Sequence, residues 1–151
     1  MNGLSLLAVG ELFVVDVTRI QKVARDMAFT PVPAAPDEVV GIANFKGGIV
    51  TLISLSEMLG RGRSAKAVHA VIFKPFEEEN SQMGLLIDSP GDLITIDDAE
   101  ILPPRFAAQD EDRSFISGFA EVGGKFYRII DIDLVRNKLA KRGNERCDFN
   151  D

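Results

Sequence analysis

The chain has 151 residues, the size of one ordinary domain or of two small half-domains that share a core. Hydrophobic residues make up 46% and charged residues 26%, which excludes a disordered chain. Seventeen Lys and Arg against 23 Asp and Glu give a net charge of -6, so we expect no nucleic-acid partner. The single cysteine, Cys147, excludes an internal disulfide framework and a multi-cysteine zinc site.

The apolar stretches are short. The longest, residues 12–15 and 84–87, fall far below the ~20 residues of a bilayer span. The first residues also lack the basic region that begins a signal peptide. We therefore expect a soluble cytoplasmic protein with no membrane insertion.

The chain begins with two runs of strand-forming residues, 4–9 and 11–17, which Gly10 separates. Alternation places Phe13 and Val15 on one face of the second run, so this segment predicts a β-hairpin. From Val17 to Ala24 the apolar spacing changes, which favours a short helical or irregular turn.

Three prolines between residues 31 and 36 predict an extended connection along a sheet edge. Two further runs, 39–45 and 49–55, flank Lys46-Gly47-Gly48, where glycine permits a tight reversal, and they predict a second hairpin. A helical turn is expected at 55–59, before a flexible loop at 61–66.

The second half repeats this alternation of strands and turns. Residues 67–76 and 83–88 predict two strands joined by an acidic, solvated turn at 77–81. Residues 105–114 are expected to form a mobile loop. The chain closes with a hairpin around Gly123-Gly124, followed by a helix over 133–141 for which Asp133 is the expected N-cap.

An internal repeat is the most informative feature. Residues 41–53 align with 118–130 at a constant offset, and each copy is a hairpin followed by a short helix. The chain therefore reads as two β-rich units of about 70 residues. Units of that size are marginally stable alone, so we expect them to pack on each other, with Ile53 and Ile130 as equivalent buried positions.

The predicted fold is all-β, with two small barrels and short helices that include a C-terminal one. We expect one domain over residues 1–142, divided into two β-subdomains near residues 61–66, with a possible crossover of strands between them. Residues 143–151 are expected to be a polar tail.

Several segments follow one another in a characteristic order, together with the final hairpin: Val15-Asp16-Val17, Ile20-Gln21-Lys22-Val23, Pro31 to Pro33, Val40 to Gly47, Ile49 to Ser54, Gly84 to Asp88 and Ile116-Ser117-Gly118. Through these segments, which span about residues 4–139, the sequence resembles the CheW-like domain family. It implies two five-stranded SH3-like β-barrel subdomains. It also implies a non-enzymatic scaffold, without cofactors, that couples the cytoplasmic tip of a chemoreceptor to the regulatory domain of a histidine kinase.

The resemblance further implies a set of partner-binding or motif positions, namely Ile20, Lys22, Gly41, Asn44, Lys46, Gly47 and Ile49. For Gly41, Gly47 and Ile49, hairpin architecture is an equally good explanation. Two positions depart from the family pattern. Lys46 replaces the arginine of the family's Asn-Leu-Arg-Gly hairpin, and Lys22 replaces a glutamate that can pair with that arginine. The two lysines cannot form this ion pair and are expected to repel each other.

The residues that could carry other chemistry are few. His69 stands alone in a strand pattern and lacks companions for a metal or nucleophilic site. Asp131 and Asp133 would share a face if their strand continued, and Asp97-Asp98 lies close to Glu100, so either group could hold a cation. A solvated turn is the simpler interpretation of these acids, and no metal site is predicted.

Two further possibilities remain open. Basic residues on the last helix could contact phosphate or acidic partners, although a solvated face is more common: Arg136, Lys138, Lys141, Arg142 and Arg146. A small β-barrel enzyme that uses a divalent ion at Asp131 and Asp133, or a sensor that binds a small ligand between the subdomains, is the alternative to the adaptor.

Overall fold

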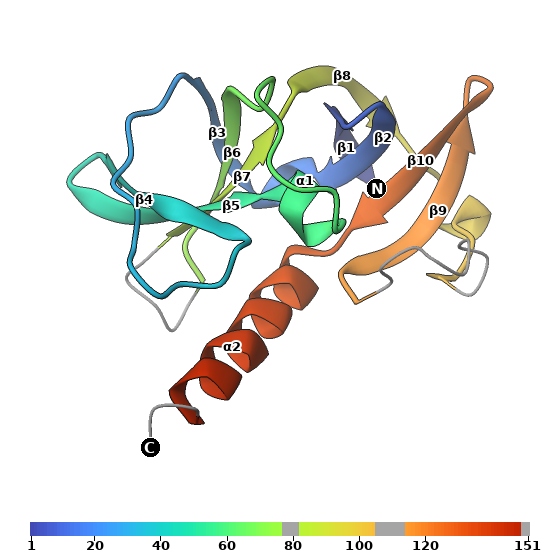
Figure 1. Cartoon of the computed structure of the whole chain (residues 1–151). Coiled ribbons are helices and arrows are strands. Elements are labelled where there is room, and N and C mark those ends of the chain that lie inside the picture. The colour runs from blue at the N-terminus through green and yellow to red at the C-terminus, as the bar shows by residue number, and fades with distance from the viewer. Residues whose placement is uncertain (77–81, 105–113, 149–151) are drawn as a thin grey trace.

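The computed structural model describes residues 1–76, 82–104 and 114–148, with the side chains of the last helix described as far as Lys141. Two five-stranded sheets dominate the fold (Figure 1). We call them the central sheet and the terminal sheet, after the part of the chain that forms each. The predicted all-β fold is confirmed, and two five-stranded sheets are consistent with SH3-like barrels.

The central sheet lies on the left in Figure 1 and has the order β3-β6-β7-β5-β4. Its strands are β3 (Ile20–Arg25), β4 (Val39–Phe45), β5 (Gly48–Ser54), β6 (His69–Phe73) and β7 (Gln82–Ile87). The terminal sheet has the order β8-β1-β2-β10-β9. It contains β1 (Asn2–Ala8), β2 (Glu11–Asp16), β8 (Ser89–Thr95), β9 (Ile116–Val122) and β10 (Lys125–Ile130).

Within the described residues, four complete helical segments connect and cover these strands. They are η1 (Val17–Arg19), α1 (Leu55–Met58), η2 (Asp98–Glu100) and α2 (Ile132–Asp148). In Figure 1, α2 runs away from the junction of the two sheets. The predicted terminal helix is therefore confirmed, but it continues beyond residue 141 into the segment that we expected to be a polar tail.

The three predicted hairpins form as expected, as β1–β2, β4–β5 and β9–β10. The proline-containing connection follows the outside of the central sheet, where Thr30 bridges Ile42 of the edge strand β4. The predicted irregular turn over 17–24 is only partly correct, because η1 ends at Arg19 and the remainder is strand β3. The acidic turn at 77–81 and most of the loop expected at 105–114 lie outside the described residues.

The segment at 61–66, near which we expected the two β-subdomains to divide, lies within the central sheet, and strands cross between the two halves of the chain as the prediction allowed. This segment joins β5 to β6, and both strands belong to the central sheet. The chain instead changes sheet at η1 and again between Ile87 and Ser89. The physical reason is strand pairing, because β6 pairs with β3 and β7 pairs in parallel with β5, which keeps the middle of the chain together.

The two sheets have the same topology with a different starting point. In each sheet, the second strand of a hairpin (β5 of β4–β5, or β10 of β9–β10) pairs in parallel with a third strand (β7 or β2). Two antiparallel pairings, β7–β6–β3 or β2–β1–β8, then complete the sheet. Strands β3 to β7 thus correspond to β8, β9, β10, β1 and β2. The internal repeat is circularly permuted, since its second copy is completed by the first two strands of the chain.

Apolar packing ties the two sheets together. The largest buried cluster takes Phe13 and Val15 from the terminal sheet, Phe73 and Leu85 from the central sheet, and Val135 from α2. Each sheet also has a smaller cluster of its own. The predicted sharing of apolar surface is therefore confirmed, and Ile53 and Ile130 both belong to the shared cluster.

Candidate functional site

The β4–β5 hairpin ends in a tight turn of fixed shape. Lys46 and Gly47 both have positive φ angles, of 52° and 79°, as a two-residue hairpin turn with the twist of the strands requires. The side-chain oxygen of Asn44 accepts a hydrogen bond from the backbone N–H of Gly47, with an N···O distance of 3.2 Å. Asn44 and Gly47 thus build the turn that presents Lys46 to solvent.

The residues predicted to bind partners fall into two groups. Asn44, Lys46, Gly47 and Ile49 lie together on the exposed end of the hairpin, where Asn44 pairs directly with Ile49. Ile49 is 55% exposed, which is high for an isoleucine in a strand. These four residues form one continuous surface.

The other three positions differ in environment. Lys22 is exposed on β3, whereas Ile20 is half-buried and packs against the shared core. Gly41 is buried, and a Cβ atom there would lie 2.5 Å from the backbone oxygen of Thr30. Gly41 therefore has a clear architectural role, which is to let the connection that contains Thr30 cross the hairpin.

The ammonium groups of Lys22 and Lys46 both lie near the aromatic ring of Phe45. The Nζ atom of Lys22 lies 5.9 Å from the ring centroid of Phe45, and that of Lys46 lies 5.4 Å from it. Phe45 itself is buried in the smaller cluster of the central sheet. Barrel curvature thus brings the two edge strands of this sheet, β3 and β4, to a common surface.

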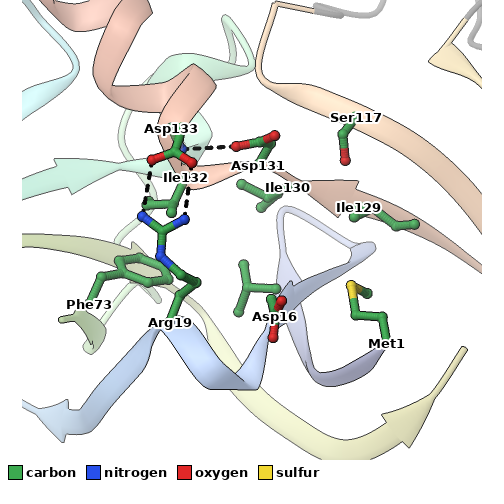
Figure 2. Close-up of a pocket in the computed structure, with 11 residues that line it drawn as sticks. Met1, Asp16, Arg19, Phe73, Ser117, Ile129, Ile130, Asp131, Ile132 and Asp133 are labelled. Carbon is green, nitrogen blue, oxygen red and sulfur yellow. Dashed lines mark hydrogen bonds and ion pairs between the residues drawn. The ribbon is translucent and has the colours of Figure 1, made fainter. Parts of the chain in front are cut away.

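A second feature is a pocket of about 190 Å³ at the junction of the two sheets (Figure 2). Both sheets and the start of α2 contribute to its wall: Met1, Val15, Asp16, Arg19, Phe73, Ser117, Ile129, Ile130, Asp131, Ile132 and Asp133. Its charged groups are largely occupied by local interactions. Asp16, for example, accepts hydrogen bonds from both the backbone N–H and the hydroxyl of Thr18.

An ion pair between Arg19 and Asp133 closes one side of this pocket. Both terminal nitrogens of Arg19 donate to the two carboxylate oxygens of Asp133, each at 3.0 Å (Figure 2). The hydrogen bond from Arg19 lowers the pKa of Asp133, and the same bond raises the pKa of Arg19. The bidentate geometry fixes the start of α2 against the segment where the chain first changes sheet.

The structure corrects the interpretation of the acidic pair Asp131 and Asp133. Strand β10 ends at Ile130, so the two carboxylates do not share a strand face. Asp131 is the residue that caps α2, because its Oδ1 accepts from the N–H groups of Asp133 and Leu134, at 2.9 and 3.4 Å. The expected cap, Asp133, lies inside the first helical turn and pairs with Arg19 instead.

Other candidate residues also have local roles. The Nδ1 atom of His69 on β6 forms a hydrogen bond of 3.0 Å with the backbone oxygen of Asp88, the residue that follows β7. Asp97 caps η2, and Asp98 pairs with the amino terminus. Within the part of the chain that the structure describes, no three His, Cys, Asp or Glu side chains gather into a group that could hold a metal ion.

Two basic residues of α2, Arg136 and Lys138, are half-buried, whereas Lys141 is exposed as expected. The guanidinium of Arg136 lies 4.4 Å from the ring centroid of Phe76, and the ammonium of Lys138 lies 5.3 Å from that of Phe115. These two side chains therefore pack α2 against the sheets. The side chains of Arg142 and Arg146 lie outside the described residues.

Comparison with known proteins decides the family. The model of the CheW-like domain matches residues 2–139, almost the whole chain. The chain belongs to the CheW-like domain family. The family resemblance drawn from the sequence is confirmed.

Relatives support this assignment along most of their length. The chain is 28% identical over 123 residues to the chemotaxis protein CheW of Rhizobium meliloti (strain 1021), covering 82% of this chain and 79% of the relative. It is 24% identical over 124 residues to the probable chemotaxis protein CheW of Rhizobium etli, with 82% and 79% covered. The crystal structure of scaffolding protein TtCheW from Thermoanaerobacter tengcongensis superposes with a TM-score of 0.76 at 26% identity, over 86% of this chain and 88% of that one.

None of the described helices is both long and apolar enough to span a membrane.

Proposed function

We propose that this protein is a non-enzymatic adaptor of chemotaxis-type signalling, which couples chemoreceptors to a histidine kinase through protein–protein contacts. The observation that carries this proposal is the agreement over the whole domain with a scaffolding protein of the same family. The match includes both sheets, so it extends beyond a single shared motif. The role of adaptor places the protein in the cytoplasm, with the receptor tip and the kinase.

The partner surface that we propose includes the exposed end of the β4–β5 hairpin and the neighbouring part of β3. Its members are Ile20, Lys22, Gly41, Asn44, Lys46, Gly47 and Ile49. An exposed isoleucine beside polar and charged groups is the usual composition of a protein-binding surface. Gly41 and Ile20 contribute by shaping the strands that present the other residues.

The fold suits a scaffold because its two sheets are held as one unit. The shared core and the Arg19–Asp133 ion pair both connect them. A rigid adaptor keeps receptor and kinase at a fixed separation. A conformational change in the receptor can then shift the equilibrium between the active and inactive states of the kinase. The size of that shift is limited by the difference between the contacts that the two receptor states make with the adaptor.

The alternative functions receive no support. A metal-dependent enzyme at Asp131 and Asp133 would need both carboxylates, but one caps α2 and the other is held by Arg19. A sensor of small ligands would use the pocket at the sheet junction, whose charged side chains already have partners within the protein.

A direct test is to isolate the tagged full-length protein from the cytoplasm of its source cell and identify what co-purifies. We expect a histidine kinase and a chemoreceptor together, in amounts that rise and fall with the bait. The matched control is the same tag on an unrelated small β-barrel protein. Recovery of neither partner from cells that express both would contradict the proposal.

A further inference from the structure

Strands β2 and β3 belong to different sheets, yet only the three residues of η1, Val17–Arg19, join them (Figure 1). The residues on either side of η1 are already extended, with ψ angles of 120° at Asp16 and 132° at Ile20. If the three residues of η1 also became extended, β2 and β3 would run on as one continuous strand. η1 is therefore a hinge between the β1–β2 hairpin and the central sheet.

The amino acids of this hinge favour the extended conformation. Val17 and Thr18 are both β-branched, which disfavours helical backbone and favours strands. Val17 is half-buried and Thr18 is exposed, so straightening η1 removes little apolar surface from the core. The local preference of the hinge thus opposes the turn that the monomer requires, a conflict of the kind that gives a segment a second accessible state.

Polar interactions hold η1 in its turn. The Oδ1 atom of Asp16 accepts hydrogen bonds from the backbone N–H and the hydroxyl of Thr18, at 2.9 and 2.8 Å. Arg19 forms its bidentate ion pair with Asp133 at the start of α2 (Figure 2). All of these bonds are exposed to solvent, where each adds little stability. The closed hinge is therefore maintained by a few small contributions.

The β1–β2 hairpin occupies the middle of the terminal sheet, between β8 and β10. β2 pairs in parallel with β10 through Phe13 and Val14, and β1 pairs with β8 over residues 2–7. Both partner strands follow the whole central sheet along the chain. A second copy of the chain offers the same two strands, so the hairpin can form the same contacts between two chains as within one.

We propose that two copies of this chain exchange their β1–β2 hairpins and form a closed dimer in which both η1 hinges are extended. The exchange retains the contacts of the hairpin, so monomer and dimer differ through the two hinges and the entropy of association. This inference goes beyond the adaptor function. A dimer of this kind carries the proposed partner surface twice and can engage two partners at once.

An engineered disulfide distinguishes the exchanged dimer from any other dimer. Asn2 on β1 lies directly opposite Thr95 on β8, and their exposed side chains are hydrogen-bonded at 3.0 Å. Asn2→Cys and Thr95→Cys are combined with Cys147→Ser, so that only this pair can be oxidised. The disulfide closes within one chain in the monomer, but it joins two chains in the exchanged dimer.

The hinge variant is Asp16→Ala, which removes the cap of η1. The cap stabilises only the closed hinge, so its loss should raise the association constant of the dimer at least about fivefold. Asp97→Ala is the matched control, because Asp97 caps η2 in the same way, at 3.0 Å from the N–H of Ala99, while the strands on both sides of η2 stay in the terminal sheet. Circular dichroism verifies that each variant folds.

The full-length double-cysteine protein, with and without each cap variant, is refolded under reducing conditions at ~10 μM and ~1 mM, separated by size and then oxidised. We expect a dimer that grows with protein concentration and with Asp16→Ala, and that stays covalently joined on a non-reducing denaturing gel. A dimer whose chains separate on that gel would overturn the inference. The absence of a dimer from Asp16→Ala at ~1 mM, or equal association constants for Asp16→Ala and Asp97→Ala, would also overturn it.

Discussion

Gly41 and Gly118 hold the same position in the two hairpins, and each lies beneath a crossing segment of backbone. A Cβ atom at Gly41 would lie 2.5 Å from the oxygen of Thr30, and one at Gly118 would lie 2.8 Å from the oxygen of Leu102. In both cases the crossing residue forms a pair of 2.8 Å backbone hydrogen bonds with the residue that follows the glycine. The two barrels thus close in the same way.

Substitution of either glycine should therefore destabilise the fold. We expect Gly41→Ala and Gly118→Ala each to lower the free energy of unfolding by about 1 to 3 kcal/mol, because a backbone carbonyl cannot move aside without breaking its bridge. The matched control is Gly48→Ala, where the nearest atom to a new Cβ would be 3.5 Å away. Urea denaturation measures all three, and equal stabilities of Gly41→Ala and Gly48→Ala would contradict this explanation.

The equivalence of Ile53 and Ile130 gives a second prediction. Both are buried in the shared cluster, at 1% and 4% exposure, so truncation of either to alanine should cost about 2 to 5 kcal/mol. Ile49→Ala removes the same atoms from an exposed site and should change stability by less than about 0.5 kcal/mol. A loss below ~1 kcal/mol at both buried sites would show that the shared core does not determine stability.

The internal repeat allowed several structural features to be predicted from the sequence. Aligning 41–53 with 118–130 gave both hairpins and the two buried isoleucines. The same alignment places Ser54 opposite Asp131, and both cap the helix that follows. Extending the alignment by one residue therefore identifies Asp131 as the cap of α2, whereas Asp133 lies within the first helical turn.

Other features had no local signal. The sequence of a strand does not identify the strand that will pair with it in parallel. The pairing of β10 with β2, and therefore the assignment of strands to the two sheets, depends on contacts between residues that are distant in sequence. The same is true of Arg19 and Asp133, which are 114 positions apart. The approach of Lys22 and Lys46 to the ring of Phe45 could be expected only from the family resemblance, because the two lysines lie on opposite edges of the sheet.

The Arg19–Asp133 pair predicts a pH dependence of stability. Pairing lowers the pKa of Asp133 below its ordinary value of 3.8, so the folded state binds a proton there less readily than the unfolded state does. The stabilisation is present above that value and is lost as the pH falls through the lowered pKa. Because Asp133 is more than half exposed, the contribution at neutral pH should not exceed about 1 kcal/mol.

Comparison of the native protein with Asp133→Asn checks this point. Their difference in unfolding free energy should be constant from about pH 7 to pH 5 and should shrink towards about pH 3. Asp92→Asn, an exposed change of the same kind on β8, should show no such difference. A gap between native protein and Asp133→Asn that widens on acidification would have the wrong sign for this ion pair.

The two lysines predict a change in partner choice. Lys22→Glu combined with Lys46→Arg should create an ion pair near Phe45, since the planar guanidinium suits a carboxylate. We expect the double variant to bind the regulatory domain of a kinase from a typical member of the family more tightly than the native protein does, with folding stability changed by no more than about 1 kcal/mol. Isothermal titration of both proteins measures this, and equal affinities would show that these positions do not set partner choice.

The central claim, that this protein is an adaptor, is tested most directly by reconstitution. Kinase autophosphorylation is measured in a mixture of purified kinase and receptor-bearing membranes, with and without the full-length protein. The account predicts that the receptor changes the rate of autophosphorylation only when the adaptor is present, and that the effect saturates with adaptor concentration. Receptor control of the kinase that is the same with and without the protein would contradict it.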